Sequence, residues 1–278
     1  MSVAAGAVAA AVFASSPARE AVIGRSVQGR RIEAVHRGEM RGSKPVLVVG
    51  CIHGNEGAGL AIVKALERLR PPAGDDLWLI ENLNPDGYAG GTRQNAHGVD
   101  LNRNFPWAWR PLGGTFDSGP RPLSEPESRS AYRLILRVRP AISIWFHQHL
   151  RVVDESGGDL RIERRFAQLV GLPLRRLTRE PGSAVGWENH HLGGTTAFVV
   201  ELPAGSLTTA AAARYARAVL ALSSYASRPA VPRRPRTAVG RPAPRRRRSR
   251  ARRAAPPSTL RAAASTRPAS SRDAARSP

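Results

Sequence analysis

Short apolar runs alternate with amphipathic stretches along the first 226 residues of the chain. Four continuous apolar runs have the length of buried strands, and they lie at 45–50, 77–80, 141–146 and 195–202. Three stretches have the apolar spacing of helices, and they lie at 59–70, 124–139 and 207–225. Because strands alternate with helices, the pattern predicts an α/β fold with a mixed, mainly parallel sheet and helices on both faces. We expect a single domain over residues 20–226.

Turn and capping residues mark the boundaries of these elements. Residues 22–38 predict two short strands around a turn near Gly29. Ser124 and Glu127 have the spacing of a capping box, in which each side chain bonds the other residue's backbone at the start of a helix. The stretch 82–123 is rich in Asn, Gly and Pro. A loop of that length inside a compact domain is usually functional.

Positive charge is concentrated at the C-terminal end. The chain has 43 Lys and Arg residues against 21 Asp and Glu, a formal net charge of +22. Residues 228–278 hold 16 Arg and one acid, Asp273, so they account for +15 and leave +7 for the rest. This segment has few large apolar residues, which predicts a disordered tail over 227–278. Because the tail has no aromatic side chain for base stacking, we expect no specific nucleic acid partner.

The N-terminal segment 1–19 has two interpretations. Val3 to Phe13 is apolar and small residues follow it, as in a signal peptide, whereas the lack of a basic start fits a misassigned N-terminus. Export and cytoplasmic residence are both compatible with this pattern. No other apolar run is long enough to form a transmembrane segment. The single Cys51 allows no internal disulfide, and we expect a monomer or a weak oligomer.

Candidate catalytic side chains lie at the predicted carboxyl ends of three strands. They are His53 with Glu56, His147 and Glu201. In open α/β sheets, ligands bind outside the carboxyl ends of the strands. We therefore expect these side chains to face one site.

His53 and Glu56 have the spacing of a metal-binding pair. If a helix begins near Gly54, a separation of three residues places both side chains on one face. Two neighbouring ligands, a distant third and an open fourth position are typical of catalytic zinc. The third ligand is His147, which comes first after its strand, or His149, which we otherwise expect to line the site. The alternative is a polar helix start and a polar strand end without a metal.

Glu201 closes an apolar strand, where burial of an unpaired carboxylate is costly. Burial raises the pKa of a carboxyl group, and a pKa nearer neutrality suits a general base. The alternative role is an ion pair with one of the many arginines of the chain.

Polar residues of the segment GTRQNAHGVDLNRNFP are candidates for substrate binding. Asn102 and Arg103 offer amide and guanidinium donors side by side, and a guanidinium group binds a carboxylate through two parallel hydrogen bonds. Arg93 precedes them in the same predicted loop. The alternative for each arginine is a solvated surface charge.

Taken in order, these segments resemble the zinc carboxypeptidases of the carboxypeptidase A type. The segments are HGNE at 53–56, NPDG at 84–87, GVDLNRNFP at 98–106, the histidine at 147 and VELPAG at 200–205. The ordered set is more specific than any one motif. The sequence around Arg93 and the short separation of Glu56 and His147 along the chain are most similar to a compact bacterial branch, the murein peptide amidases. That branch cleaves between γ-D-glutamate and meso-diaminopimelate in cell-wall peptides.

The resemblance implies a metallopeptidase with one zinc ion per chain. It implies that His53, Glu56 and His147 bind this ion. The substrate it implies is a small peptide with a free carboxylate.

The same resemblance implies the roles of four other side chains. Arg93 would polarise the scissile carbonyl group, and Glu201 would activate water. Asn102 and Arg103 would hold the terminal carboxylate of the substrate.

The sequence departs from the family pattern in one respect. Many members have a tyrosine on a mobile loop between the third ligand and the base, but this chain has none between Tyr132 and Tyr215. The corresponding stretch has Arg179, Glu180 and Trp187 instead.

Two other functions are compatible with the sequence. An N-acyl amino acid deacylase of the aspartoacylase and succinylglutamate desuccinylase type has similar HGNE and DLNR patterns. An inactive relic whose basic tail binds a partner is the non-enzymatic alternative. The NPDG segment and the carboxylate-binding pair favour the peptidase.

Overall fold

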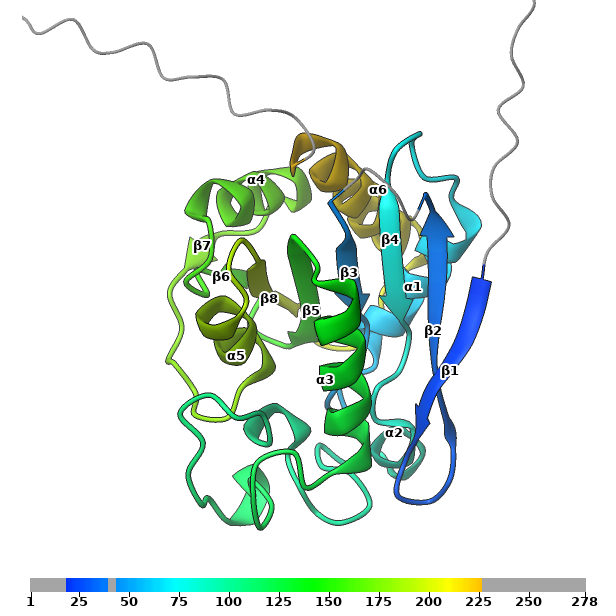
Figure 1. Cartoon of the computed structure of the whole chain (residues 1–278). Helices are drawn as coiled ribbons and strands as arrows, with labels where there is room; N and C mark the ends of the chain where they lie inside the picture. The colour runs from blue at the N-terminus through cyan, green and yellow to red at the C-terminus, as the bar shows by residue number, and fades with distance from the viewer. Residues whose placement is uncertain (1–18, 40–43, 227–278) are drawn as a thin grey trace, which may run out of the picture. The chain divides into compact units, whose positions relative to one another are not determined.

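The computed structural model describes residues 19–39 and 44–226 (Figure 1). In these ranges the chain forms one eight-stranded sheet with the order β1-β2-β4-β3-β5-β8-β6-β7. The strands are β1 (Arg19–Arg25), β2 (Arg31–Gly38), β3 (Val46–Val49), β4 (Asp76–Ile80), β5 (Ile142–Gln148), β6 (Val152–Asp154), β7 (Leu174–Arg175) and β8 (Thr196–Leu202). The predictions made for residues 1–18 and 227–278 lie outside the described residues.

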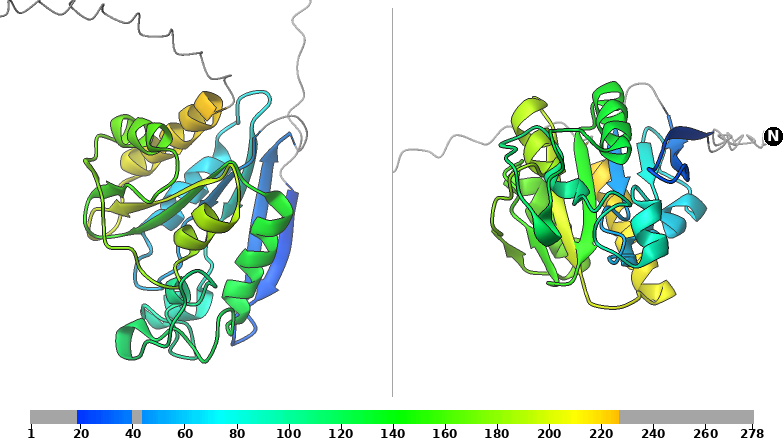
Figure 2. Two further views of the ribbon diagram at one scale, coloured as in Figure 1. Left: turned by 60° about the vertical axis from the view of Figure 1, so that its left-hand side comes forward. Right: turned by 90° about the horizontal axis from the view of Figure 1, so that it is seen from below.

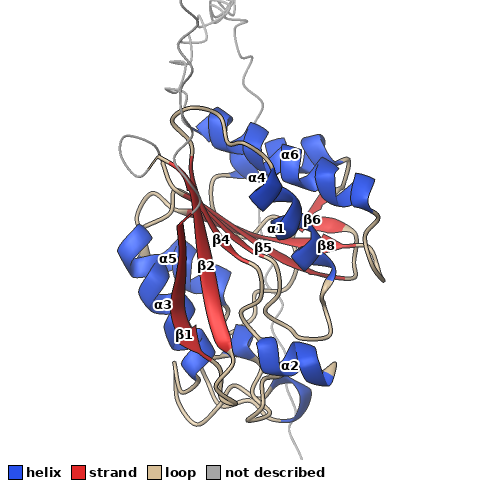
Figure 3. Ribbon diagram, turned by 90° about the vertical axis from the view of Figure 1, so that its right-hand side faces the viewer, coloured by secondary structure: helices blue, strands red, loops and turns tan. Residues whose placement is uncertain are grey.

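Helices cover both faces of this sheet (Figure 3). The helices are α1 (Ala58–Arg68), α2 (Pro85–Gly90), α3 (Pro126–Val138), α4 (Leu160–Val170), α5 (Ala184–His191) and α6 (Thr209–Ala226). Helices α1, α4 and α6 lie on one face, and α3 and α5 lie on the other. In the described part of the chain, no helix has the length and apolar character of a membrane span.

The middle of the sheet is parallel, and an antiparallel pair lies on each side of it. Strand β3 is parallel to β4 and β5, and β5 is parallel to β8. Strand β2 is antiparallel to β4, and β6 is antiparallel to β8. The carboxyl ends of β3, β5 and β8 therefore lie at one edge of the sheet, and the loops of residues 91–123 gather beyond that edge (Figure 2).

Alternation along the central strands explains why the sheet needs two helical layers. On β3, Val46 and Val48 belong to the core under α1, α4 and α6, whereas Leu47 and Val49 belong to the core under α3 and α5. Successive side chains of a strand point to opposite faces, so a continuous apolar run is buried on both sides. The predicted mixed, mainly parallel α/β sheet is confirmed.

Helix α1 begins at Ala58, close to the predicted start at residue 59, so the condition of a helix start near Gly54 is not met. The prediction of a capping box is wrong. Helix α3 begins after Glu125, without a side-chain cap, so the capping box is absent. Instead, Glu127 accepts hydrogen bonds from the backbone N–H of Val27 at 3.0 Å and from Asn95 Nδ2 at 3.0 Å. The carboxylate of Glu127 therefore bonds to residues far away in the chain and not to the start of its own helix.

The sequence pattern missed the elements between residues 152 and 191. Strands β6 and β7 have only three and two residues, which is too short for a visible alternation. Helix α5 has no single apolar face, because the adjacent residues Ala184 to Glu188 are all buried. A helix that is buried on most sides lacks the amphipathic signature.

Candidate active site

The histidine and carboxylate candidates lie at the carboxyl ends of β3, β5 and β8. His53 and Glu56 are in the loop between β3 and α1, where the backbone N–H of Glu56 donates to the carbonyl oxygen of His53 at 2.9 Å. This turn, rather than a helix, brings the two side chains together. His147 lies near the end of β5, and its partner in the register is Glu201 on β8.

Glycines allow the His53 loop to pack tightly on the NPDG segment. A Cβ atom on Gly54 would lie 2.0 Å from the carbonyl carbon of Gly87, so only glycine fits there. The NPDG segment itself starts α2, because Asn84 Oδ1 accepts from the backbone N–H of Gly87 at 3.0 Å. The two motifs are therefore parts of one packed corner.

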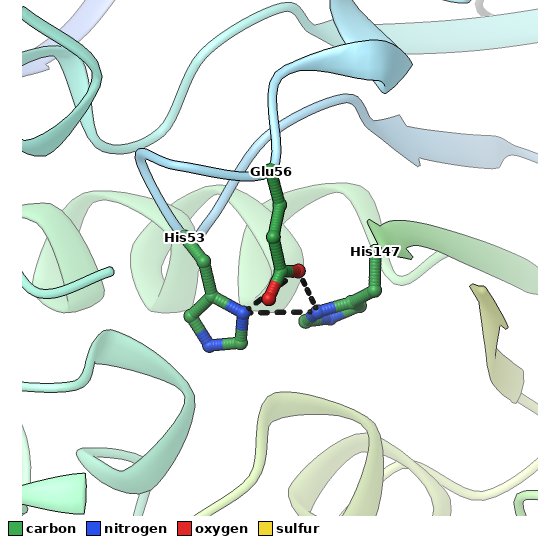
Figure 4. A group of neighbouring side chains, drawn as sticks. All are labelled: His53, Glu56 and His147. Carbon is green, nitrogen blue, oxygen red and sulfur yellow. Dashed lines mark hydrogen bonds and ion pairs between the residues drawn. The ribbon is translucent and has the colours of Figure 1, made fainter. Parts of the chain in front are cut away.

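His53, Glu56 and His147 converge on one point (Figure 4). The two Nδ1 atoms are 3.1 Å apart, and each lies 3.0 Å from Glu56 Oε2. Three ligands of a tetrahedral zinc ion lie about 3.3 Å apart when their bonds are about 2.0 Å long. All three residues are buried. The donor set and its spacing therefore fit a zinc ion with a fourth position left for water or substrate.

Asp100 contacts the ring of His53 on the side away from Glu56 and His147. Its Oδ1 lies 3.0 Å from His53 Nε2, and its Oδ2 accepts from Arg93 Nε at 2.9 Å. A carboxylate on the far nitrogen of a metal-binding histidine fixes the ring and directs Nδ1 toward the metal. The sequence reading missed Asp100, although it is part of the quoted DLNR pattern. Asp100 is 47 residues away from His53 in the chain, so no local pattern marks the contact.

Burial and neighbouring charges act on both acids of this group. Burial alone would raise the pKa of Asp100, but the charge and hydrogen bond of His53 outweigh it and lower the pKa. Burial opposes ionisation of Glu56 too, yet hydrogen bonds from His147 and His53 hold its pKa below the usual range. Both carboxyl groups are therefore ionised at neutral pH.

Glu201 lines a pocket of about 310 Å³ together with His53, Glu56 and His147. Its Oε2 accepts from the backbone N–H of Leu150 at 3.4 Å. The side chain is half-buried, because the end of β8 opens into the pocket. Among the described residues, Glu201 has no ion pair with an arginine.

The arginines and the asparagine predicted for substrate binding line the same pocket. Arg93 donates to Glu56 Oε1 at 3.1 Å. Arg103 is 5% exposed, and its Nε has no hydrogen-bond partner within the described ranges. Asn102 Oδ1 accepts from the backbone N–H of Ala184 at 3.0 Å, which leaves its amide group to donate. Both arginines line the pocket, so the alternative that they are solvated surface charges is wrong.

His149 is the one candidate that lies elsewhere. It is exposed, and it does not line the pocket. Strand β5 ends at Gln148, so the alternation that would have placed His149 beside His147 stops there. The expectation that His149 lines the site is therefore wrong.

Comparison with known proteins agrees with this geometry. A family model described as zinc carboxypeptidase matches residues 74–153. Murein peptide amidase A of Escherichia coli (strain K12) is 31% identical over 157 residues, which are 51% of this chain and 64% of that protein. The crystal structure of murein-tripeptide amidase from Escherichia coli O157 has a TM-score of 0.61 at 26% identity and covers 76% of this chain and 93% of that chain. Residues 74–153 are therefore similar to the zinc carboxypeptidase family.

Two further carboxypeptidases are similar to parts of this chain. Carboxypeptidase D of Drosophila melanogaster is 36% identical over 110 residues, which are 30% of this chain and 8% of that protein. Carboxypeptidase A of Helicoverpa armigera has a TM-score of 0.64 at 19% identity, covering 76% of this chain and 68% of that chain, which shows a shared fold. The sequence match to murein peptide amidase A spans less than two thirds of that relative's length.

Residues of the loop that has no tyrosine complete the pocket. Arg179 and Glu180 line it, whereas Trp187 is buried in the core under α5. Arg179 Nη1 lies 3.6 Å from Oδ2 of Asp154, a buried residue at the end of β6. The sequence reading did not single out Asp154, because β6 was not predicted.

Proposed function

We propose that this protein is a zinc-dependent carboxypeptidase or amidase that hydrolyses an amide bond next to a free C-terminal carboxylate. One observation carries the proposal. A buried His-Glu-His group, a half-buried carboxylate and a pair of donors for a carboxylate line one pocket. Such a pocket can hold a metal, a base and the end of a peptide at the same time.

His53, Glu56 and His147 would hold the zinc ion. Zinc in such a site acts as a Lewis acid and makes a bound water easier to deprotonate. Glu201 accepts a proton from water and transfers it to the leaving amine, because its carboxylate faces the pocket from the strand next to His147. Asp100 keeps the ring of His53 in the orientation that directs Nδ1 toward the pocket.

The arginines and the asparagine have separate tasks in this proposal. Arg93 lies beside Glu56, so its guanidinium group is close enough to stabilise negative charge that develops on the scissile carbonyl oxygen. Arg103 and the amide group of Asn102 bind the terminal carboxylate of the substrate. The guanidinium group of Arg103 is largely buried in the pocket wall, where its attraction for an anion is stronger than in water, and its Nη2 already lies 3.4 Å from one carboxylate, that of Glu180.

We further propose that the substrate is a murein peptide cleaved between γ-D-glutamate and meso-diaminopimelate. The support comes from the murein peptide amidase relatives and from the charges of the pocket. The side chain of diaminopimelate ends in both an ammonium and a carboxylate group. Asp154 and Arg179 offer the two complementary charges in one place.

A substrate panel tests both levels of this proposal. The zinc-loaded chain is incubated with a murein tripeptide, an ordinary L-peptide, the carboxamide form of each and an N-acyl amino acid, and released amino acids are measured by mass spectrometry. We expect release of diaminopimelate to be fastest and the carboxamides to be poor substrates. Faster hydrolysis of acyl amino acids would favour a deacylase, and no hydrolysis by zinc-loaded protein would remove the enzymatic proposal.

A further inference from the structure

Phe116 lies over both arginines of the pocket. The Cζ atom of Arg93 is 5.4 Å from the centre of the Phe116 ring, and the Cζ atom of Arg103 is 5.3 Å from it. Both distances are within the range of about 6 Å in which an aromatic face attracts a cation. Phe116 is 49% exposed, so apolar burial alone is a weak reason for its position.

The backbone on each side of Phe116 is tied to the segment that carries the arginines. Gln94, next to Arg93, donates from Nε2 to the carbonyl oxygen of Gly114 at 2.8 Å. The backbone N–H of Asp100 donates to the carbonyl oxygen of Asp117 at 2.7 Å. An exposed ring that is anchored at both ends keeps a fixed position relative to the two guanidinium groups.

We propose that Phe116 is a positioning residue that sets Arg93 and Arg103 for the substrate. This inference rests on the proposed function, because it assigns the two arginines to the substrate. The ring attracts two guanidinium groups that repel each other. The N–H donors of a guanidinium lie in its plane, so a ring over its face does not compete for them. The ring also shields the guanidinium groups from water, which strengthens their interaction with an anion.

Three substitutions of Phe116 distinguish the effect of its aromatic face from the effect of its apolar volume. Phe116→Leu keeps a large apolar side chain and removes the aromatic face, whereas Phe116→Tyr and Phe116→Trp keep it. Tyr225→Leu is the matched control, because Tyr225 is another exposed aromatic residue and lies on α6, outside the pocket. All variants are made in the full chain and loaded with zinc.

Binding of succinate, a dicarboxylate without a peptide bond, is measured by calorimetry, with neutral succinamide as the comparison ligand. We expect Phe116→Leu to weaken succinate binding about tenfold, since two cation contacts are lost. Phe116→Tyr, Phe116→Trp and Tyr225→Leu should stay within about twofold of the wild type. Succinamide binding should not change. Equal losses in the Leu and Tyr variants, or no loss in either, would overturn the proposal.

A second measurement does not depend on any ligand or on turnover. The ring current of Phe116 shifts the Nε–Hε signals of Arg93 and Arg103 in ¹H–¹⁵N spectra, so both signals should move in Phe116→Leu and neither in Tyr225→Leu. If the wild type hydrolyses no peptide while these shifts and the succinate pattern hold, the proposed function fails and the role of Phe116 stands. If succinate does not bind the wild type, unmoved signals in Phe116→Leu would by themselves overturn the role.

Discussion

His147 and Glu201 are register partners on the parallel strands β5 and β8. Neighbouring strands lie about 4.8 Å apart, so the sheet fixes the distance between the backbones that carry the proposed metal ligand and the proposed base. No flexible loop lies between them. A change at Glu201 can therefore alter proton transfer without moving the metal ligands.

Glu201→Gln keeps the size of the side chain and removes its ability to accept a proton. We expect the turnover rate to fall by at least about a hundredfold, the usual contribution of a general base. Zinc content, measured by atomic emission, should stay at one ion per chain. Glu81→Gln, a substitution of an acid that pairs with Lys64, is the control. Turnover that survives in Glu201→Gln would remove this residue from the mechanism.

Asp100→Asn tests the carboxylate behind His53. Asparagine keeps the shape but loses the charge that fixes the ring of His53, so zinc affinity should fall by about ten- to a hundredfold. The measurement is competition with a chelator of known affinity. Asp159→Asn is the control, because Asp159 caps α4 and asparagine caps a helix equally well. Unchanged zinc affinity in Asp100→Asn would contradict the assignment.

Arg103→Lys tests the carboxylate-binding position. Lysine keeps the charge but cannot form two parallel hydrogen bonds, so KM should rise about tenfold with little change in kcat. The rise should be absent for carboxamide substrates, which lack the bound anion. Arg164→Lys, at an exposed position of α4, should behave as the wild type. A KM that rises equally for both substrate forms would argue against a role in binding the carboxylate.

The raised pKa of Glu188 predicts that the stability of the protein depends on pH. Burial raises its pKa from 4.5 to about 7, while hydrogen bonds with Ser143 and Trp145 oppose this shift. The unfolded chain releases this proton near pH 4.5 and the folded chain near pH 7. The free energy of unfolding should therefore decrease between those values, by about 2–3 kcal/mol from pH 5 to pH 8.

Glu188→Gln removes this titration and keeps a side chain that can bond to both partners. Its stability should fall less than that of the wild type between pH 5 and pH 8, as measured by urea unfolding at each pH. Parallel stability profiles for the two proteins would show that Glu188 is ionised in the folded state at both values.

The sequence alone determined the layered architecture. Continuous apolar runs such as Val46 to Val49 exclude a sheet that has one solvent-exposed face. Both faces of the sheet must therefore be covered by helices. Because parallel strands share one edge for their carboxyl ends, the positions of His53, His147 and Glu201 along the chain already implied a common site.

Only the tertiary structure decided which polar groups meet. Asp100 binds His53 across 47 residues, and Glu127 binds Val27 across 100 residues, so neither contact leaves a local pattern in the sequence. Phe116 has no periodicity that distinguishes it from other residues of a long loop. Hydrogen bonds and cation contacts depend on distances of a few ångströms in space, and a chain pattern reports only those between near neighbours or on regular elements.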